Sequence, residues 1–156
     1  MRKNIKTLII CLAIPIVVGG LSALLSGGMD NFDTLIKPPL SPPGWLFPVV
    51  WTILYLMMGF ASFLVYTANA PTYKKNSALL VYGIQLFFNF LWSIIFFRFE
   101  AYLFAFIWLV VMWVLILITL VRFWEIRKSA GYLLIPYFVW VAFAGYLNIA
   151  IYILNS

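Results

Sequence analysis

The chain has 156 residues, of which 66% are hydrophobic and 9% are charged; its net charge is +6 and its mean hydropathy is +1.09. A soluble domain is about half apolar and about a quarter charged, so this composition excludes a soluble enzyme, a disordered chain and a disulfide-stapled secreted domain. The length leaves room for about five or six membrane spans of roughly 20 residues each.

Uncharged apolar segments follow one another along the chain. Each is long enough to cross a hydrocarbon core of about 30 Å as a helix, and none shows the alternation of a membrane barrel strand. We therefore predict an all-α integral membrane protein, a five-transmembrane-helix bundle forming a single domain over residues 1–156. The predicted spans cover about residues 6–26, 45–67, 77–97, 101–123 and 130–153.

The first segment follows a basic start and could also be a signal peptide. Its apolar stretch is longer than that of a typical signal peptide, and no convincing small-x-small cleavage site follows it. We therefore expect a retained helix, with a kink at Pro15.

One connection, residues 27–44, is long, and Pro38, Pro39, Pro42 and Pro43 stiffen its second half. It is either a rigid strap between two helices or a lid over a cavity, because long ordered loops in small folds often carry function. Its position alone leaves both interpretations open.

Eight of the ten basic residues fall on one side of a five-span protein, and only Lys37 and Arg98 fall on the other. The positive-inside rule then places the N-terminus in the cytoplasm and the C-terminus outside a bacterial-type plasma membrane. Because the basic residues cluster at span ends, we expect a lipid bilayer as their partner and no nucleic acid.

Aromatic and amide side chains recur at three- and four-residue spacing in three of the spans, which puts them on one face of each helix. A carboxamide in hydrocarbon needs a hydrogen-bond partner, so these faces should point inward. They are either contacts that hold the helices together or the walls of a pocket for a large, flat, mostly apolar ligand. The residues are Trp51 and Tyr55; Gln85, Asn89 and Trp92; and Tyr137, Trp140, Ala144 and Asn148.

The fourth span differs, because its rings have no accompanying amide. We interpret it as a lipid-facing or scaffold helix. Its large rings include Phe104, Phe106, Trp108 and Trp113.

The residues missing from the chain limit its chemistry. It has no His, a single cysteine (Cys11), and four acids that all lie outside the long apolar runs. We therefore predict no metal site, no axial haem ligand from His and no conventional catalytic residue. An ion-coupled pump is disfavoured, because such proteins keep an ionisable group at mid-membrane depth.

Three sequence stretches together resemble the TspO/MBR family, which comprises tryptophan-rich sensory proteins and translocator proteins, also known as peripheral-type benzodiazepine receptors. The first runs from Lys37 through Pro-Pro-Leu-Ser-Pro-Pro-Gly to Trp45 and on to Gly59. The second is the Gln85, Asn89 and Trp92 pattern, and the third runs from Leu134 to Asn148. The resemblance covers nearly the whole chain.

The resemblance implies a five-helix bundle that often forms a homodimer and needs no cofactor. It implies binding of porphyrins such as protoporphyrin IX or haem, of other tetrapyrroles, and of drug-like isoquinoline carboxamides and benzodiazepines. The implied pocket lies beneath the 27–44 loop. Family pocket positions match Phe32, Pro42, Pro43, Trp51, Tyr55, Asn89, Trp92, Trp140, Ala144 and Asn148, while Leu40 stands where many members have Trp.

We therefore expect a membrane receptor for tetrapyrroles that acts as a sensor, scavenger or transporter, with Lys37 as one possible contact to a propionate. The alternative is an enzyme that degrades bound porphyrin with light and oxygen, using Trp51 and Trp140. A channel-like transporter is disfavoured by the absence of mid-membrane charge and of a clear inverted repeat. A role as an assembly partner of other membrane proteins stays open.

Overall fold

The computed structural model describes residues 2–27 and 34–156. Five helices in this part of the chain are long and apolar enough to cross a membrane, which confirms the expected all-α membrane fold. They are α1 (Arg2–Leu25), α3 (Leu46–Tyr66), α4 (Thr72–Ser93), α5 (Tyr102–Ile126) and α6 (Lys128–Asn155). A short π-helix, η1 (Ile94–Arg98), continues α4.

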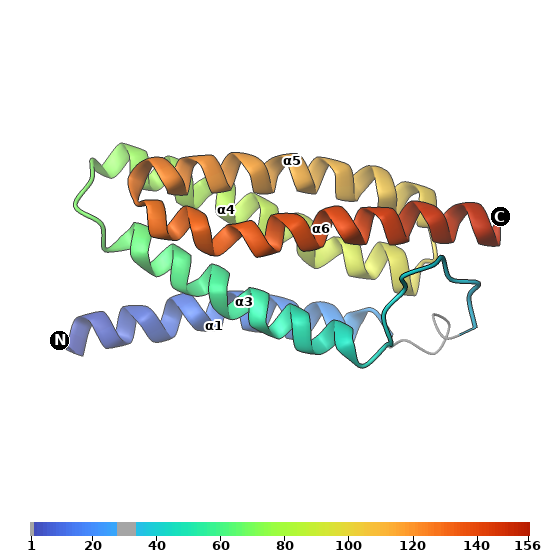
Figure 1. Ribbon diagram of the computed structural model, residues 1–156. Coiled ribbons are helices and arrows are strands. Elements are labelled where there is room, and N and C mark those ends of the chain that lie inside the picture. Colours follow the sequence, from blue (N-terminus) through green and yellow to red (C-terminus); the bar gives the residue numbers. More distant parts are fainter. Residues whose placement is uncertain (1, 28–33) are drawn as a thin grey trace.

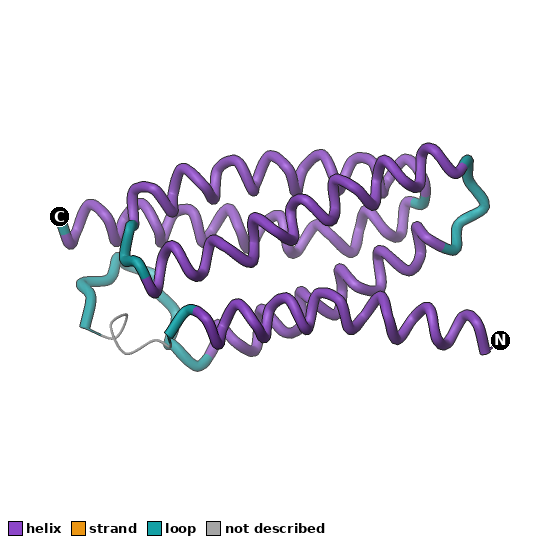
Figure 2. The backbone as a smooth tube through the Cα atoms, turned by 180° about the vertical axis from the view of Figure 1, so that it is seen from behind, coloured by secondary structure: helices purple, strands orange, loops and turns teal. Residues whose placement is uncertain are grey.

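The helices form a ring of neighbours. Helix α1 packs against α3, α3 against α6, α6 against α5, α5 against α4, and α4 returns to α1. In Figure 1, α1 and α3 make one side of the bundle and the other helices the opposite side. The described part of the long loop lies at the end of the bundle where the chain finishes, away from the start of α1 (Figures 1 and 2).

Helix ends differ from the predicted spans where charge or proline sets them. Helix α1 begins at Arg2 rather than near residue 6, because hydrophobicity marks the depth of the membrane while the helix itself continues into its charged flank. Helix α4 begins at Thr72, directly after Pro71, rather than near residue 77. A proline is well tolerated at the start of a helix, where no backbone N–H partner is needed.

Helices α1 and α3 are in close backbone contact at Gly59. Helix α1 continues through Pro15, whose missing N–H leaves the carbonyl of Cys11 without its usual helical partner. A Cβ atom on Gly59 would lie 2.6 Å from that carbonyl oxygen and 2.9 Å from the Cα of Leu12. Only glycine therefore allows this crossing.

Helix α5 serves mainly as a scaffold. The indole N–H of Trp108 donates to the carbonyl of Phe88 at 2.8 Å, and that of Trp113 donates to the carbonyl of Phe138 at 3.1 Å. Each indole also stacks on the ring of the same phenylalanine. Phe104, by contrast, is exposed on the outside of the bundle. The interpretation of this helix as lipid-facing or scaffold thus applies in both parts. Trp108 and Trp113 hold neighbouring helices, and Phe104 faces outward.

Candidate functional site

A cavity of about 480 Å³ lies inside the bundle, in the half nearest the long loop. Its walls come from α1, α3, α4 with η1, and α6, and no residue of α5 lines it. Six of the predicted site residues lie in these walls: Trp51, Tyr55, Trp92, Trp140, Ala144 and Asn148. The site therefore draws together three of the helix faces that sequence spacing had singled out.

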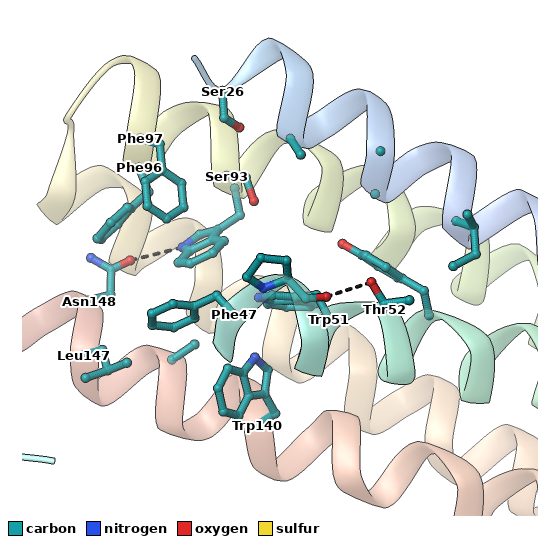
Figure 3. Close-up of a pocket in the computed structure, with 18 of the residues that line it drawn as sticks. Ser26, Phe47, Trp51, Thr52, Ser93, Phe96, Phe97, Trp140, Leu147 and Asn148 are labelled. Atoms are coloured by element: carbon teal, nitrogen blue, oxygen red, sulfur yellow. Dashed lines mark hydrogen bonds between the residues drawn. The ribbon is translucent and has the colours of Figure 1, made fainter. Parts of the chain in front are cut away.

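Three large rings form the wall between α3 and α6. The ring of Trp140 meets that of Trp51 edge to face, with centroids 6.5 Å apart and planes at 85°. Phe47 approaches Trp140 in a similar way at 6.0 Å. Figure 3 shows these rings projecting from their two helices into the cavity. Such a corner offers one ring face and one ring edge to the same ligand.

The opposite wall is built around Trp92. Its indole N–H donates to the Oδ1 atom of Asn148 at 3.1 Å, and the Nδ2 atom of Asn148 donates to the carbonyl of Tyr102 at 2.8 Å. The ring of Phe96, from η1, stacks on Trp92 with centroids 5.4 Å apart. Figure 3 shows the Trp92–Asn148 bond as a dashed line. The amide of Asn148 therefore fixes the orientation of a cavity ring.

Tyr55 bounds the cavity at its inner end. Its ring stacks on Trp51 at 5.6 Å, and its hydroxyl donates to the Oδ1 atom of Asn89 at 2.9 Å. The ring fits only because residue 19 is a glycine: a Cβ atom there would lie 2.2 Å from Cε2 of Tyr55. The close approach of α1 to α3 thus holds this ring in place.

Three predicted site residues lie behind the cavity rather than in its walls. Asn89 donates from Nδ2 to the hydroxyl of Tyr137 at 2.7 Å, and Tyr137 donates to the Oε1 atom of Gln85 at 2.7 Å. All three side chains are at most 1% exposed. They join α4 to α6 and hold Tyr55 from behind, so they support the wall without forming it.

One polar atom at the cavity is left over. The Nε1 atom of Trp140 is buried and has no hydrogen-bond partner among the described residues. Figure 3 shows this indole with its nitrogen on the side of Phe47 and Trp51. A buried donor without an acceptor is unfavourable by about 1–3 kcal/mol. A ligand with an acceptor at this point would remove that penalty.

The described part of the loop is tied to α6. The side-chain amide of Asn155 accepts from the backbone N–H of Ile36 at 3.0 Å and donates to its carbonyl at 2.8 Å. The hydroxyl of Tyr146 donates to the carbonyl of Pro39 at 2.7 Å. None of residues 34–44 lines the cavity, so Pro42 and Pro43 lie outside its walls. Leu40 is 83% exposed, and Phe32 lies outside the described residues.

Sequence reasoning missed the contribution of α1. Gly19, Gly20, Ala23 and Ser26 line the cavity, yet the α1 segment is almost uniformly apolar and carries no amide or aromatic face. The available signal was the row of small residues, which leaves room beside a helix. Among the described residues, no group of His, Cys, Asp or Glu could hold a metal ion.

Comparison with known proteins gives a consistent result. Residues 10–154 match the TspO/MBR family. The chain is 38% identical to the tryptophan-rich protein TspO of Chlorobaculum tepidum, over 99% of each chain. It is 34% identical to the protein CrtK of Rhodobacter capsulatus, over 88% of this chain and 85% of that protein. It is 32% identical to the translocator protein of Ovis aries, over 78% of this chain and 72% of that protein.

The match spans all five membrane helices and every wall of the cavity. The alignment with the Chlorobaculum tepidum protein covers 99% of both chains, so the similarity extends over the whole bundle rather than over one motif. The chain belongs to the TspO/MBR family, and it is an integral membrane protein of five helices.

Proposed function

We propose that the protein is a membrane receptor for porphyrins and related tetrapyrroles, acting as a sensor, scavenger or transporter. The observation that carries this proposal is the cavity corner formed by Phe47, Trp51 and Trp140. Its volume of about 480 Å³ falls within the range of about 300–1,000 Å³ that is usual for small-molecule sites. Names of relatives such as sensory protein and translocator protein are consistent with a receptor or carrier.

The chemistry of the walls favours a flat ligand with one polar edge. Ring faces and edges stack on a planar apolar ligand, and the unpartnered N–H of Trp140 can donate to a carboxylate or carbonyl at its edge. The sequence contains no His, so a metalloporphyrin would receive no imidazole ligand. Binding therefore rests on stacking and apolar burial, and requires no cofactor.

The test is a titration of the purified protein with protoporphyrin IX, followed by quenching of tryptophan fluorescence and by the absorbance of the porphyrin. Trp51→Ala and Trp140→Ala should each weaken binding about tenfold or more, or about 1.4 kcal/mol, because each removes one ring of the corner. Trp45→Ala is the matched control, since Trp45 is 68% exposed and does not line the cavity.

Unchanged affinity in both cavity variants would refute this site. Equal losses in all three variants would mean that the effect comes from the membrane interface rather than from the cavity. Trp140→Phe separates stacking from hydrogen bonding, because it keeps a ring and removes the free donor.

A second function is favoured by one observation: Trp51 and Trp140 line the same cavity with ring centroids 6.5 Å apart. Indoles at that distance could both donate electrons to a photoexcited porphyrin, with oxygen as the oxidant. The same complexes, illuminated in air, distinguish the two functions. A new absorbing product that disappears in Trp51→Phe and Trp140→Phe supports degradation, whereas a stable porphyrin spectrum supports the receptor.

We also propose that the start of α1 lies in the cytoplasm of a bacterial-type cell. The support is the charge at the two ends of the bundle, because the end holding the start of α1 also holds the α3–α4 and α5–α6 connections. The basic residues at that end include Lys6, Lys74, Lys75, Arg122, Arg127 and Lys128. Lys37 and Arg98 lie at the other end. On this orientation the cavity lies in the outer half of the membrane.

A further inference from the structure

The exposed lining residues of the cavity all lie on α1 and α3. They are Gly20 and Ala23 of α1 and Pro48 and Thr52 of α3. The lining residues of α4, η1 and α6 are buried or half-buried. We refer to these four exposed residues as the mouth. The mouth is lateral, because it lies along two helices rather than at the end of the bundle.

The packing of the two helices explains why they part here. They are in close contact at Gly59, where a Cβ atom would strike the backbone of α1. Closer to the loop, Tyr55 of α3 presses on Gly19 and bounds the cavity. One residue further, a Cβ atom on Gly20 would meet nothing within 4 Å. The contact at Tyr55 is thus tight, and on the loop side of it Gly20 and Ala23 line the cavity and are exposed.

The surroundings of the mouth are apolar. Val17, Leu21 and Leu24 of α1 are exposed on the outside of the bundle, as are Val49 and Ile53 of α3. In a five-helix membrane protein, exposed side chains of this kind face lipid. The mouth therefore opens into the hydrocarbon of one leaflet, the leaflet that adjoins the 34–44 segment.

The described part of the loop is held against α6. Residues 34–44 do not line the cavity, and the amide of Asn155 holds Ile36 through two hydrogen bonds. Tyr146 holds Pro39 through a third. These bonds hold the 34–44 segment against α6, whereas the α1 side of the mouth is bordered by the small residues Gly20 and Ala23.

We propose that the tetrapyrrole of the proposed function enters sideways, from the leaflet adjoining the 34–44 segment, through the mouth between α1 and α3. This inference rests on that proposed function and specifies its ligand class. The ligand is a flat, membrane-dissolved molecule whose apolar ring passes Gly20 and Ala23. Its polar edge stays near the headgroups, at the loop end of the cavity.

The test fills the mouth without touching the core. Gly20→Leu places a branched side chain where the structure has open space, and Gly83→Leu is the matched control. Gly83 is exposed on α4, lies outside the cavity, and also has nothing within 4 Å of its Cβ position. Proteins in liposomes are mixed with protoporphyrin IX already dissolved in the bilayer, and association and dissociation rates are measured by stopped-flow fluorescence.

We expect Gly20→Leu to slow both rates about tenfold while the dissociation constant changes much less, because a narrowed passage raises the barrier in both directions. Gly83→Leu should match the wild type. If Gly20→Leu does not fold, Ala23→Leu narrows the same seam at an exposed helical position.

Two results would overturn the lateral route. One is a wild-type association rate in the mouth variants. The other is faster association in Asn155→Ala, which frees Ile36 and would matter only if the ligand passed beneath the loop. Absence of porphyrin binding by the wild-type protein would instead refute the proposed function itself.

Discussion

At the scale of single residues, Tyr137 holds two helices together through one hydroxyl. That oxygen accepts from Asn89 and donates to Gln85, each at 2.7 Å, in a core where these side chains are at most 1% exposed. Tyr137→Phe would leave both amides short of a partner. We expect the free energy of unfolding to fall by about 1–3 kcal/mol, measured by chemical denaturation in detergent.

Tyr132→Phe is the control for this prediction. It makes the same chemical change on the same helix, at a residue that is 58% exposed, so stability should stay within about 0.5 kcal/mol of the wild type. Equal stability of the two variants would show that the buried chain of hydrogen bonds contributes little beyond packing. The same Tyr137→Phe protein should also bind porphyrin more weakly, because Asn89 helps to hold Tyr55 at the cavity.

Residue-scale prediction from sequence succeeded where a polar atom had to be satisfied. The spacing of Gln85, Asn89 and Asn148 indicated inward-facing amides, and the structure buries all three. The spacing could not predict that Gln85 and Asn89 would bond to Tyr137 behind the cavity, because it does not show which residues of an inward face border a cavity and which are packed behind it. The partner of Trp108 could not be predicted either, because its indole N–H donates to a backbone carbonyl and every residue has one.

At the scale of helices, the crossing of α1 and α3 depends on Gly59. In an exposed helix, replacing glycine with alanine usually adds about 0.5–1 kcal/mol of stability. At Gly59 the added Cβ would meet the carbonyl of Cys11 at 2.6 Å, and backbone cannot move aside cheaply. We therefore expect Gly59→Ala to destabilise the protein by about 1–3 kcal/mol in thermal unfolding.

Gly83→Ala should change the stability in the opposite direction. Nothing lies within 4 Å of its Cβ position, so the ordinary gain of alanine in a helix should remain. If Gly59→Ala were as stable as Gly83→Ala, the two helices would be able to separate freely, and the narrow end of the mouth would not be fixed by this crossing.

Helices themselves were the easiest part to predict. Runs of apolar residues about as long as the membrane is thick identified all five spans, and errors were confined to ends where charge or Pro71 extends the helix. The part played by α1 in the cavity was not predictable in the same way. Gly19 and Gly20 act through the space they leave, and their value depends on the ring of Tyr55 on another helix.

At the scale of the whole molecule, charge and cavity lie at opposite ends. Most of the basic residues lie at the end that holds the start of α1, while the cavity and its mouth belong to the end with the 34–44 segment. The positive-inside rule uses only the Lys and Arg counts of the loops, so the sequence alone already predicts an orientation. The order of the helices around the bundle could not be predicted from the spacing of residues along each helix. That spacing shows which face of a helix is buried, but not which other helix packs against it.

The predicted orientation can be tested by cysteine labelling in intact bacterial cells, in a Cys11→Ser background. Thr72→Cys reports on the basic end and Ser156→Cys on the other, and both positions are exposed. We expect a membrane-impermeant maleimide to label residue 156 in intact cells and residue 72 only after permeabilisation. The reverse pattern would place the mouth in the cytoplasmic leaflet, so that ligand would be drawn from the inside of the cell. Labelling of both residues after permeabilisation is the control for reactivity. It shows that a cysteine left unlabelled in intact cells was shielded by the membrane and was not simply unreactive.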